Sequence, residues 1–369
     1  MKNMISARAY RDATALALES IPIPVAGEQD VVIRVASAGL APGMMKLLER
    51  GRFRHLPTTP GHEFAGTVVD VGRDVDSAWL GKRVRAHAIL SCGECVYCRT
   101  DREQMCTEAA MVGHAALGDG PLELYARYHD GGLAEFVRVP HWLLDELPDN
   151  VSFDVGAKIH DLGNAVRALK CAALPSTGRL VITAATGTMG TASIKLAAFL
   201  GARELVLVGR SAERLGALKP LAVGMPVHCV ALQELGSDWP ASGTLTRRLL
   251  EIWPSGADAV LDFFPEGPGT AQAAAALATG GALVHMGGNR GVLPFSIRDI
   301  MHHCWRIVGT RSCTRSDTGM VIDLLRSGLL HADDLITHRF PLGRVNEALD
   351  AAASRTTPMW MTVVHPNRD

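Results

Sequence analysis

The chain has 369 residues, more than one hydrophobic core usually serves, which predicts two domains. Hydrophobic residues make up 47% and charged residues 20%, and the formal net charge of −1 argues against a strongly basic surface for nucleic acid. The apolar stretches are too short to span a membrane or to form the core of a signal peptide, so we expect a cytoplasmic protein.

Residues 1–150 are predicted to be rich in β-strands. The strand candidates are enriched in β-branched residues and separated by Gly and Pro, and they are Val31–Ala36, Gly66–Val71 and Ala134–Val139. The pattern changes after about Asp154, which marks the expected boundary between two domains.

From Leu180 onward, short apolar strands alternate with helical stretches. The strands lack strict polar–apolar alternation, as expected where both faces of a sheet are covered. This pattern predicts parallel βαβ units and therefore an α/β, doubly wound sheet. The predicted strands are Leu180–Thr183, Glu204–Val208, Val227–Val230, Ala259–Phe263, Ala282–Met286 and Trp305–Val308, with helices at Thr191–Leu200 and Ala212–Lys219. After residue 310 we expect helices at Met320–Ser327 and Val345–Ala353 and a strand at Trp360–Val364.

The turn after the first of these strands has features of a dinucleotide site. Gly187 would let the backbone approach a pyrophosphate, and Gly190 would allow close packing of helix on sheet. The helix N-terminus offers free N–H groups to phosphate. Ala185 replaces the first glycine of the usual GxGxxG pattern. The residues expected to bind cofactor here are Thr186, Gly187, Thr188, Met189 and Gly190.

The end of the next strand indicates which nicotinamide cofactor is preferred. An Asp or Glu there would bind the ribose 2′-hydroxyl of NAD. The chain instead reads Gly209-Arg210-Ser211, with Arg214 one helical turn later. Because a guanidinium can bind a 2′-phosphate bidentately, we expect NADPH in preference to NADH. Gly287 and Gly288, after a later strand, are also expected to bind the cofactor.

Four cysteines form a C-x2-C-x2-C-x7-C loop at Cys92, Cys95, Cys98 and Cys106. Four thiolates complete a tetrahedral shell around zinc and leave no open position, which indicates a structural zinc site. The spacing also permits an iron–sulfur cluster, although nothing else in the chain indicates electron transfer.

Several segments resemble the zinc-type alcohol dehydrogenase family of the medium-chain dehydrogenase/reductase superfamily. The segment 60–66 is similar to the family's G-H-E segment, and the cysteine loop begins thirty residues after His62, as in that family. The turn 184–190 resembles the A-x-x-G-x-x-G form of quinone and enoyl reductases in the superfamily, and 335–342 resembles another family segment.

The resemblance runs over nearly the whole chain and implies a GroES-like catalytic domain and a Rossmann domain. The catalytic domain would contain residues 1–153 and 311–369, with the four-cysteine zinc loop at 92–106, and the dinucleotide-binding domain would contain 154–310. It also implies a homodimer or homotetramer and hydride transfer to or from a small-molecule substrate. We expect neither nucleic acid nor membrane as a partner.

The resemblance breaks at the family's catalytic zinc. The family's C-G-[ST]-D segment corresponds here to Gly39–Lys46. Ala41 stands in place of the zinc-binding Cys, and Gly43 replaces the Ser or Thr that passes a proton. Lys46 replaces a His that commonly ends the proton relay.

Two of the family's zinc ligands, His62 and Glu63, remain, and the later ligand position falls at His160 or Asp161, with His160 favoured. Alanine cannot bind a metal. A catalytic zinc would therefore need His62, Glu63 and His160 or Asp161 to suffice, and two histidines with one carboxylate are a workable zinc set.

Three interpretations of function stay open. With zinc at His62, Glu63 and His160, the protein would be an NADPH-linked oxidoreductase of a small organic carbonyl/alcohol pair, with zinc as the Lewis acid. Without zinc, it would be a reductase of an activated C=C or C=N bond, with Lys46, His62 or Asp161 supplying the proton. A positively charged iminium substrate would need the least electrophilic activation by the protein. The third interpretation is a non-catalytic NADPH-binding sensor.

Overall fold

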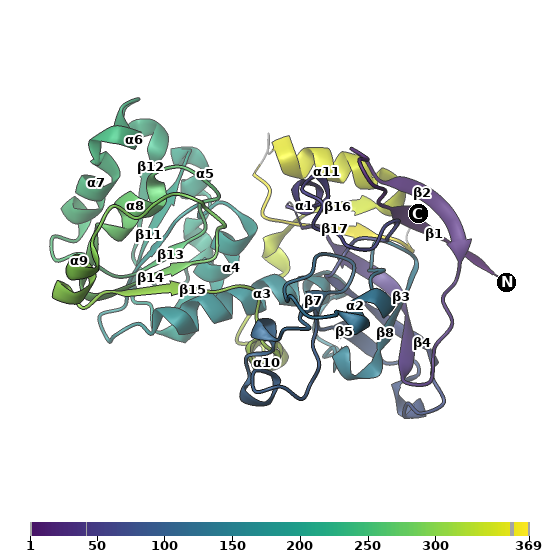
Figure 1. Cartoon of the computed structure of the whole chain (residues 1–369). Helices are drawn as coiled ribbons and strands as arrows, with labels where there is room; N and C mark the ends of the chain where they lie inside the picture. The colour runs from purple at the N-terminus through teal and green to yellow at the C-terminus, as the bar shows by residue number, and fades with distance from the viewer. Residues whose placement is uncertain (1, 42, 355–357, 368–369) are drawn as a thin grey trace. The chain divides into compact units, whose positions relative to one another are not determined.

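The computed structural model describes residues 2–41, 43–354 and 358–367, and the chain divides into two compact units (Figure 1). Unit 1 contains Met1–His160 and Thr314–Asp369, and unit 2 contains Asp161–Cys313. Both boundaries between the two units fall a few residues later in the chain than the sequence pattern predicts. At the first of them a long helix, α3 (Phe153–Ala172), runs through the division, and the sequence pattern does not predict this helix.

Unit 1 is built on a seven-stranded, mostly antiparallel sheet. Its order is β16-β17-β3-β4-β5-β9, and β8 also pairs with β3. The strands are β3 (Asp30–Gly39), β4 (Phe64–Val71), β5 (Arg83–Ala86), β8 (Phe136–Pro140), β9 (Leu144–Glu146), β16 (Ile336–Pro341) and β17 (Met361–His365). The three strands predicted before residue 150 are confirmed as β3, β4 and β8. Because β17 pairs with β3, the end of the chain completes the sheet of the first domain, as the family resemblance implies.

Smaller elements complete unit 1. They are β1 (Asn3–Arg8), β2 (Ala17–Pro22), β6 (Ile89–Leu90), β7 (Ala110–Met111), α1 (Met44–Glu49), α2 (Glu123–Arg127), α10 (Arg315–Arg326) and α11 (Val345–Ser354). The core joins inward-facing residues of β3 and β4, such as Ile33 and Val68, with Val345 of α11. In the described part of the chain, no helix combines the length and apolar character needed to cross a bilayer.

The register of β3 and β4 determines which residues meet in the candidate site. Antiparallel pairing sets Ala38 opposite Phe64. The N–H of Gly39 then donates to the carbonyl of Glu63 at 2.7 Å. The G-H-E segment therefore lies beside the end of β3.

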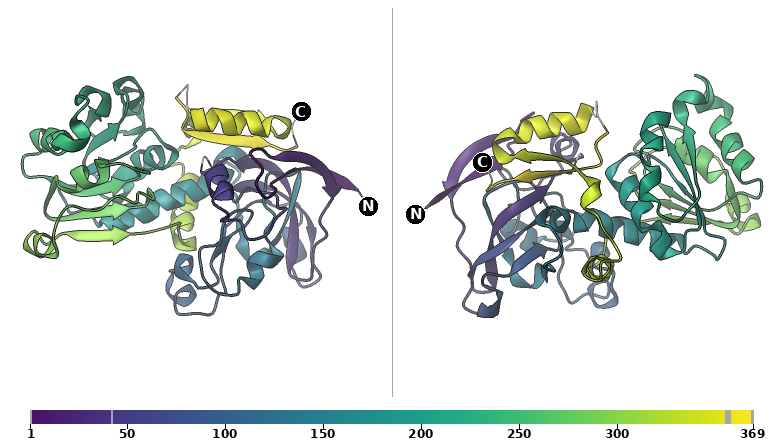
Figure 2. Two further views of the ribbon diagram at one scale, coloured as in Figure 1. Left: turned by 45° about the horizontal axis from the view of Figure 1, so that its top comes forward. Right: turned by 180° about the vertical axis from the view of Figure 1, so that it is seen from behind.

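Unit 2 is a six-stranded parallel sheet with helices over both faces (Figure 2). The order β12-β11-β10-β13-β14-β15 is that of a Rossmann domain. All six predicted strands are confirmed, as β10 (Arg179–Ile182), β11 (Glu204–Gly209), β12 (Val227–Ala231), β13 (Ala257–Asp262), β14 (Leu277–His285) and β15 (Arg306–Gly309). The helices are α4 (Thr188–Leu196), α5 (Ala212–Gly216), α6 (Trp239–Ser242), α7 (Thr244–Ile252), α8 (Gly269–Ala274) and α9 (Ile297–His302).

Candidate active site and metal centre

The predicted dinucleotide turn joins β10 to α4 in unit 2. Gly187 immediately precedes α4, and its N–H donates to the carbonyl of Ala184 at 2.9 Å. A Cβ at Gly190 would lie 2.4 Å from the carbonyl oxygen of Ala185, so the close approach of helix to turn requires glycine. The turn thus presents the N-terminal N–H groups of α4 at the carboxyl end of β10, where open α/β sheets bind nucleotides. The other predicted residues of this turn, Thr186, Thr188 and Met189, are half-buried.

The residues predicted to select the cofactor follow β11. Gly209 is the buried last residue of the strand, and Arg210 is exposed. Ser211 caps α5, where its hydroxyl accepts the N–H of Arg214 at 3.5 Å. The tip of β11 therefore carries a guanidinium in place of a carboxylate. The two later glycines, Gly287 and Gly288, follow β14.

A buried carboxylate that the sequence analysis does not single out joins three strand ends of the same sheet. Asp262, fully buried at the end of β13, accepts hydrogen bonds from Thr183 (2.6 Å) and Thr270 (2.8 Å). His285, the last residue of β14, lies 2.7 Å from the same carboxylate through Nδ1. This network fixes the carboxyl ends of β10, β13 and β14 next to the predicted nucleotide turn.

The four cysteines of the loop 92–106 converge as predicted. Their Sγ atoms all lie within 4.8 Å of one another, with Cys92–Cys98 at 3.9 Å and Cys95–Cys98 at 3.5 Å. The backbone N–H of Cys98 lowers the pKa of the Cys95 thiol to about 7, whereas burial raises the pKa values of the Cys98 and Cys106 thiols. The donor set and its spacing fit a structural zinc ion with a closed tetrahedral shell.

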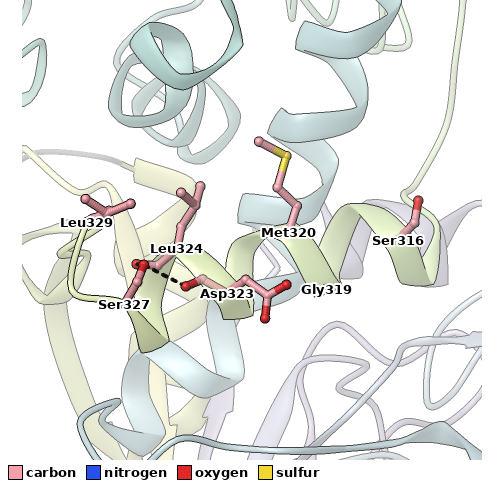
Figure 3. A pocket seen from close by; sticks show the side chains of 7 residues that line it. All are labelled: Ser316, Gly319, Met320, Asp323, Leu324, Ser327 and Leu329. Carbon is pink, nitrogen blue, oxygen red and sulfur yellow. Dashed lines mark hydrogen bonds between the residues drawn. The ribbon is translucent and has the colours of Figure 1, made fainter.

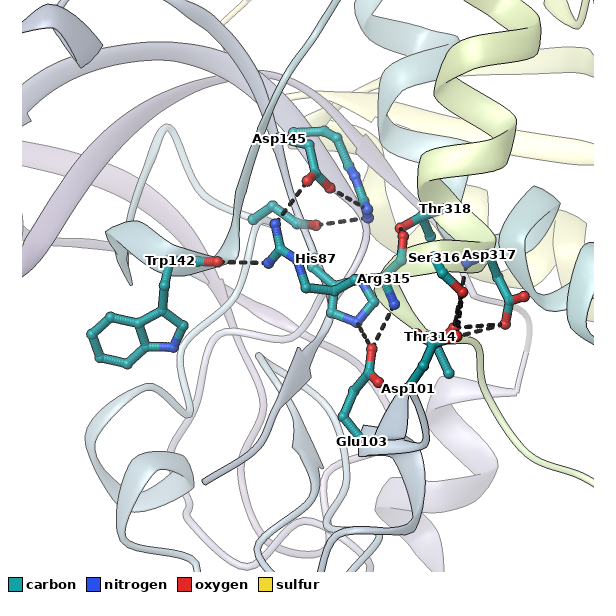
Figure 4. Close-up of polar contacts among 12 residues, drawn as sticks. His87, Asp101, Glu103, Trp142, Asp145, Thr314, Arg315, Ser316, Asp317 and Thr318 are labelled. Atoms are coloured by element: carbon teal, nitrogen blue, oxygen red, sulfur yellow. Dashed lines mark hydrogen bonds and ion pairs between the residues drawn. The ribbon is translucent and has the colours of Figure 1, made fainter. Parts of the chain in front are cut away.

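A polar network links this loop to α10 (Figure 4). Glu103, between the third and fourth cysteines, accepts the backbone N–H of Arg315 at 2.5 Å and lies 3.9 Å from Nε2 of His87. The Arg315 guanidinium donates to the carbonyl of Trp142 at 2.6 Å and to Asp145 at 2.8 Å. The cysteine loop is therefore held to the C-terminal segment of the chain through Glu103 and through Asp101, which accepts the Ser316 hydroxyl. The Arg315 guanidinium ties the same segment to residues 142–145.

Four buried polar residues gather around the buried His62 in unit 1. We call His62, Glu63, His114, Lys158 and His160 the His62 centre; each has less than a tenth of its surface exposed. The His62 ring packs edge-on against His114 at 4.4 Å and against His160 at 5.0 Å between ring centroids. Two of the predicted residues, His62 and His160, therefore do meet, and they meet together with a histidine that the sequence analysis does not name.

Glu63 lies between His62 and Lys158. Its Oε1 is 3.4 Å from Nε2 of His62, and its Oε2 accepts a hydrogen bond from the Lys158 ammonium. Burial opposes ionisation of the carboxyl, but the Lys158 charge overrides burial and holds the pKa of Glu63 well below its usual range. Glu63 is thus an ionised, paired carboxylate.

The flanking histidines, His114 and His160, are neutral because burial is the dominant effect on both of them. Burial, helped by the nearby His62, lowers the pKa of His160 to about 3 and lowers the pKa of His114 well below its usual range. In the same unit, burial and the Arg85 charge lower the pKa of His87. His62 consequently lies between uncharged imidazoles on one side and the Glu63–Lys158 ion pair on the other.

Lys46 and Asp161 complete the predicted catalytic set. Lys46 is exposed on α1, and Gly43 immediately precedes that helix. Asp161 is buried on α3 and belongs to unit 2. Ala41 is half-buried, and the adjacent Pro42 lies outside the described residues.

The side chains of the His62 centre do not fit a catalytic zinc. Ala41 has no donor atom, and Glu63 is already bound by an ammonium group. Among the residues that the structure describes, the four cysteines are the one set of three or more metal-binding side chains whose ligand atoms lie within 4.8 Å of one another. In the described part of the chain, the four thiols are therefore arranged so that they could hold a metal ion, whereas His62, Glu63 and His160 are arranged differently.

A groove of about 710 Å³ lies along one face of α10, and none of the predicted site residues lines it (Figure 3). Its lining repeats every three or four residues of the helix and consists of Ser316, Gly319, Met320, Asp323, Leu324, Ser327 and Leu329. The lining is mostly small or aliphatic, and Asp323 is its one ionisable side chain.

Two residues of the His62 centre have only weak signals in the sequence. Lys158 is a charged residue within an otherwise apolar stretch of α3, two positions before His160, and that interruption is the signal that could identify it. His114 follows a glycine in a loop and shows no pattern of its own. Only the tertiary fold brings it to His62.

Comparison with known proteins supports this description of the fold. The model of the alcohol dehydrogenase GroES-like domain matches residues 27–149, and that of the zinc-binding dehydrogenase domain matches residues 188–327. The zinc-type alcohol dehydrogenase-like protein YdjL of Escherichia coli is 28% identical over 352 residues, covering 91% of this chain and 92% of its own.

Solved structures share the whole fold. A zinc-binding dehydrogenase of Sinorhizobium meliloti bound to NADP has a TM-score of 0.83 at 22% identity, over 99% of this chain and 100% of its own. The alcohol dehydrogenase RspB of E. coli, complexed with NADH, has a TM-score of 0.84 at 21% identity over the same shares. With its GroES-like and Rossmann domains and its four-cysteine loop, this chain belongs to the zinc-type alcohol dehydrogenase family of the medium-chain dehydrogenase/reductase superfamily.

Proposed function

We propose that this protein is an NADPH-dependent oxidoreductase that works without a catalytic zinc and reduces an activated C=C or C=N bond of a small organic molecule. The observation that carries this proposal is the buried ion pair of Glu63 with Lys158, which occupies the carboxylate that a catalytic zinc would need. The loss of a donor atom at Ala41 supports it independently.

The substrate class follows from what the His62 centre lacks. Hydride addition to a simple ketone leaves charge on oxygen, which zinc stabilises as a Lewis acid. In the His62 centre the positive charge of Lys158 is neutralised by Glu63, so no strong electrophile remains. A conjugated C=C bond spreads the developing charge over a carbonyl, and an iminium carbon is already positive. Both substrates therefore need less stabilisation than a ketone does.

His62 is the residue best placed to move a proton. A bound nicotinamide supplies the hydride, and saturation of a C=C bond also requires one proton at the neighbouring carbon. Glu63, whose Oε1 lies 3.4 Å from Nε2 of His62, orients the imidazole ring. Reduction of an iminium bond needs no such proton, because the hydride alone completes the amine.

NADPH is preferred in this proposal because Arg210 stands at the end of β11, with Arg214 in the first turn of α5. A 2′-phosphate there would meet guanidinium groups, whereas the ribose hydroxyl of NADH would meet no carboxylate at the strand tip. The solved relatives do not decide the choice, since one binds NADP and the other NADH.

A substrate screen that follows NADPH absorbance tests the proposal. Enones and cyclic iminium compounds are compared with ketones and aldehydes, each with and without a chelator. We expect turnover of the activated double bonds that is insensitive to the chelator. Ketone or alcohol turnover that the chelator abolishes, in protein whose fold and structural zinc persist, would contradict the proposal.

The variant His62→Ala distinguishes proton donation from hydride transfer. We expect it to lose enone reduction while keeping more of its iminium reduction, because only the first reaction needs a proton. Lys46→Ala, on the exposed side of α1, is the matched comparison. Full enone turnover in His62→Ala together with loss in Lys46→Ala would transfer the donor role to Lys46.

A further inference from the structure

Lys158 is a buried residue of the His62 centre and not a surface residue. It comes from the middle of the first half of α3, and only about 1% of its side chain is exposed. Its ammonium donates to the Glu63 carboxylate, whose side chain is about 2% exposed. A lysine loses its strong hydration on burial and is retained there only when it is paired.

The end of β3 packs tightly against the ion pair at Gly39. A Cβ placed on Gly39 would lie 2.2 Å from Oε2 of Glu63 and 2.9 Å from Cδ of Lys158. The end of β3 therefore presses against both partners, and only a glycine fits there. The Gly39 N–H also binds the backbone carbonyl of Glu63, which fixes the carboxylate relative to the strand.

The charges around the pair oppose a further cation. Lys158 already supplies the one positive charge that neutralises Glu63. Arg85, a second buried cation of this unit, is itself paired with Asp145, so Lys158 is the cation that bears directly on Glu63. A divalent metal would have to displace the Lys158 ammonium from Glu63 and would be repelled by that charge.

We propose that Lys158 is an internal cation that keeps divalent metal out of the His62 centre. The inference deepens the proposed function, since it names the residue that makes the centre metal-free. It also states what the centre would do without that residue. Glu63 would then be an unpaired carboxylate beside His62 and His160, and two imidazole nitrogens with one carboxylate oxygen form a workable zinc site.

The test counts zinc per chain after saturation with zinc and removal of the excess. The wild-type protein should hold one zinc, in the four-cysteine loop. Lys158→Met removes the charge and keeps the unbranched stem, and this variant should hold two. The double variant Lys158→Met/Glu63→Gln lacks both charges and is the matched control, because it should return to one zinc.

A second pair of variants tests Lys158 in a centre that has regained a thiol. Ala41→Cys adds a thiol to the segment beside Glu63 and keeps the ion pair intact. If Lys158 is what excludes the metal, Ala41→Cys alone should still hold one zinc, and Ala41→Cys/Lys158→Met should hold two. Cobalt substitution adds a spectroscopic readout. The second site of Lys158→Met should add visible ligand-field bands without near-ultraviolet thiolate charge transfer, whereas the second site of Ala41→Cys/Lys158→Met should add such charge transfer.

Two zinc ions in the wild-type protein would overturn the inference, and so would a second zinc in Ala41→Cys with Lys158 in place. One zinc in folded Lys158→Met would overturn it as well. Should Lys158→Met fail to fold, the wild-type protein and Ala41→Cys still decide the question. The count of zinc is independent of turnover, so a metal-free centre in a protein that reduces no activated double bond would refute the proposed function and leave this inference standing.

Discussion

Arg315, the first residue of α10, donates its backbone N–H to the carboxylate of Glu103 in the four-cysteine loop. The two residues are more than two hundred positions apart in the chain, and their contact joins the metal-binding loop to the segment that returns from unit 2. Glu103 is therefore expected to stabilise unit 1 and not merely its own loop.

Replacement of Glu103 by Ala should lower the free energy of unfolding by about 1–3 kcal/mol, because a buried backbone donor loses its charged acceptor. Urea unfolding at constant zinc concentration measures the change. Glu94→Ala, an exposed carboxylate of the same loop, is the matched control and should change stability by less than about 0.5 kcal/mol. Equal effects of the two substitutions would show that the Arg315 contact has no special role.

Gly39→Ala should destabilise the protein by about 1–3 kcal/mol or more, because the added methyl group overlaps the Glu63 carboxylate and the Lys158 stem. Thermal and urea unfolding report this effect. Gly43→Ala is the comparison, since a Cβ there has no neighbour within 4 Å in the described residues and its φ of −85° suits alanine. A Gly39→Ala variant as stable as Gly43→Ala would contradict the tight packing of the ion pair.

Stability should fall as the pH decreases below about 6.5. Burial lowers the pKa of His160 to about 3, and it also lowers the pKa values of His87 and His114. A histidine with a lowered pKa binds fewer protons in the folded state than in the unfolded state. Its contribution is therefore complete above the unfolded pKa and is lost as the pH falls toward the folded value. Each such histidine adds a slope approaching about 1.4 kcal/mol per pH unit.

Urea unfolding at pH 8, 7, 6 and 5, with zinc content checked at each pH, measures this slope. His160→Asn removes one titrating group and should make the slope shallower. A free energy of unfolding that stays constant from pH 7 to pH 5 would show that these histidines are not held neutral.

Arg210→Ala should weaken NADPH binding roughly tenfold or more and leave NADH binding nearly unchanged, because only NADPH offers a phosphate to the guanidinium. Fluorescence titration with both cofactors measures the two dissociation constants. Arg203→Ala removes an exposed arginine just before β11, at the opposite end of the strand from Arg210, and serves as the control. Equal affinity of the unmodified protein for the two cofactors would refute the predicted preference.

The fold could be predicted from sequence where burial and strand order produce a recognisable pattern within one short segment. The apolar runs of β10 and β11 are buried on both faces, so they lack alternation and are recognised as parallel strands. The four cysteines are close in sequence, and one loop therefore suffices to gather them. Helix α3 was not predicted, because it is buried over most of its surface and its polar residues, such as Lys158 and Asp161, are themselves buried among apolar ones.

The candidate site was only partly predictable, because its residues come from segments that meet through the sheet register. His62 and Glu63 are recognisable from the family pattern, and His160 from the position of a later ligand. Lys158 and His114 have no counterpart in that pattern, yet they determine the charge on Glu63 and the surroundings of His62. The departure at Ala41 indicates a damaged zinc site, but only the contact of Lys158 with Glu63 indicates what replaces the metal.

The central claim is that catalysis at His62 needs no metal, and the most direct measurement is the zinc content of freshly purified, catalytically active protein. The account predicts one zinc per chain, bound by the four cysteines, at full turnover of an activated double bond. Two zinc ions per chain, with turnover lost in proportion as the second is removed, would contradict it.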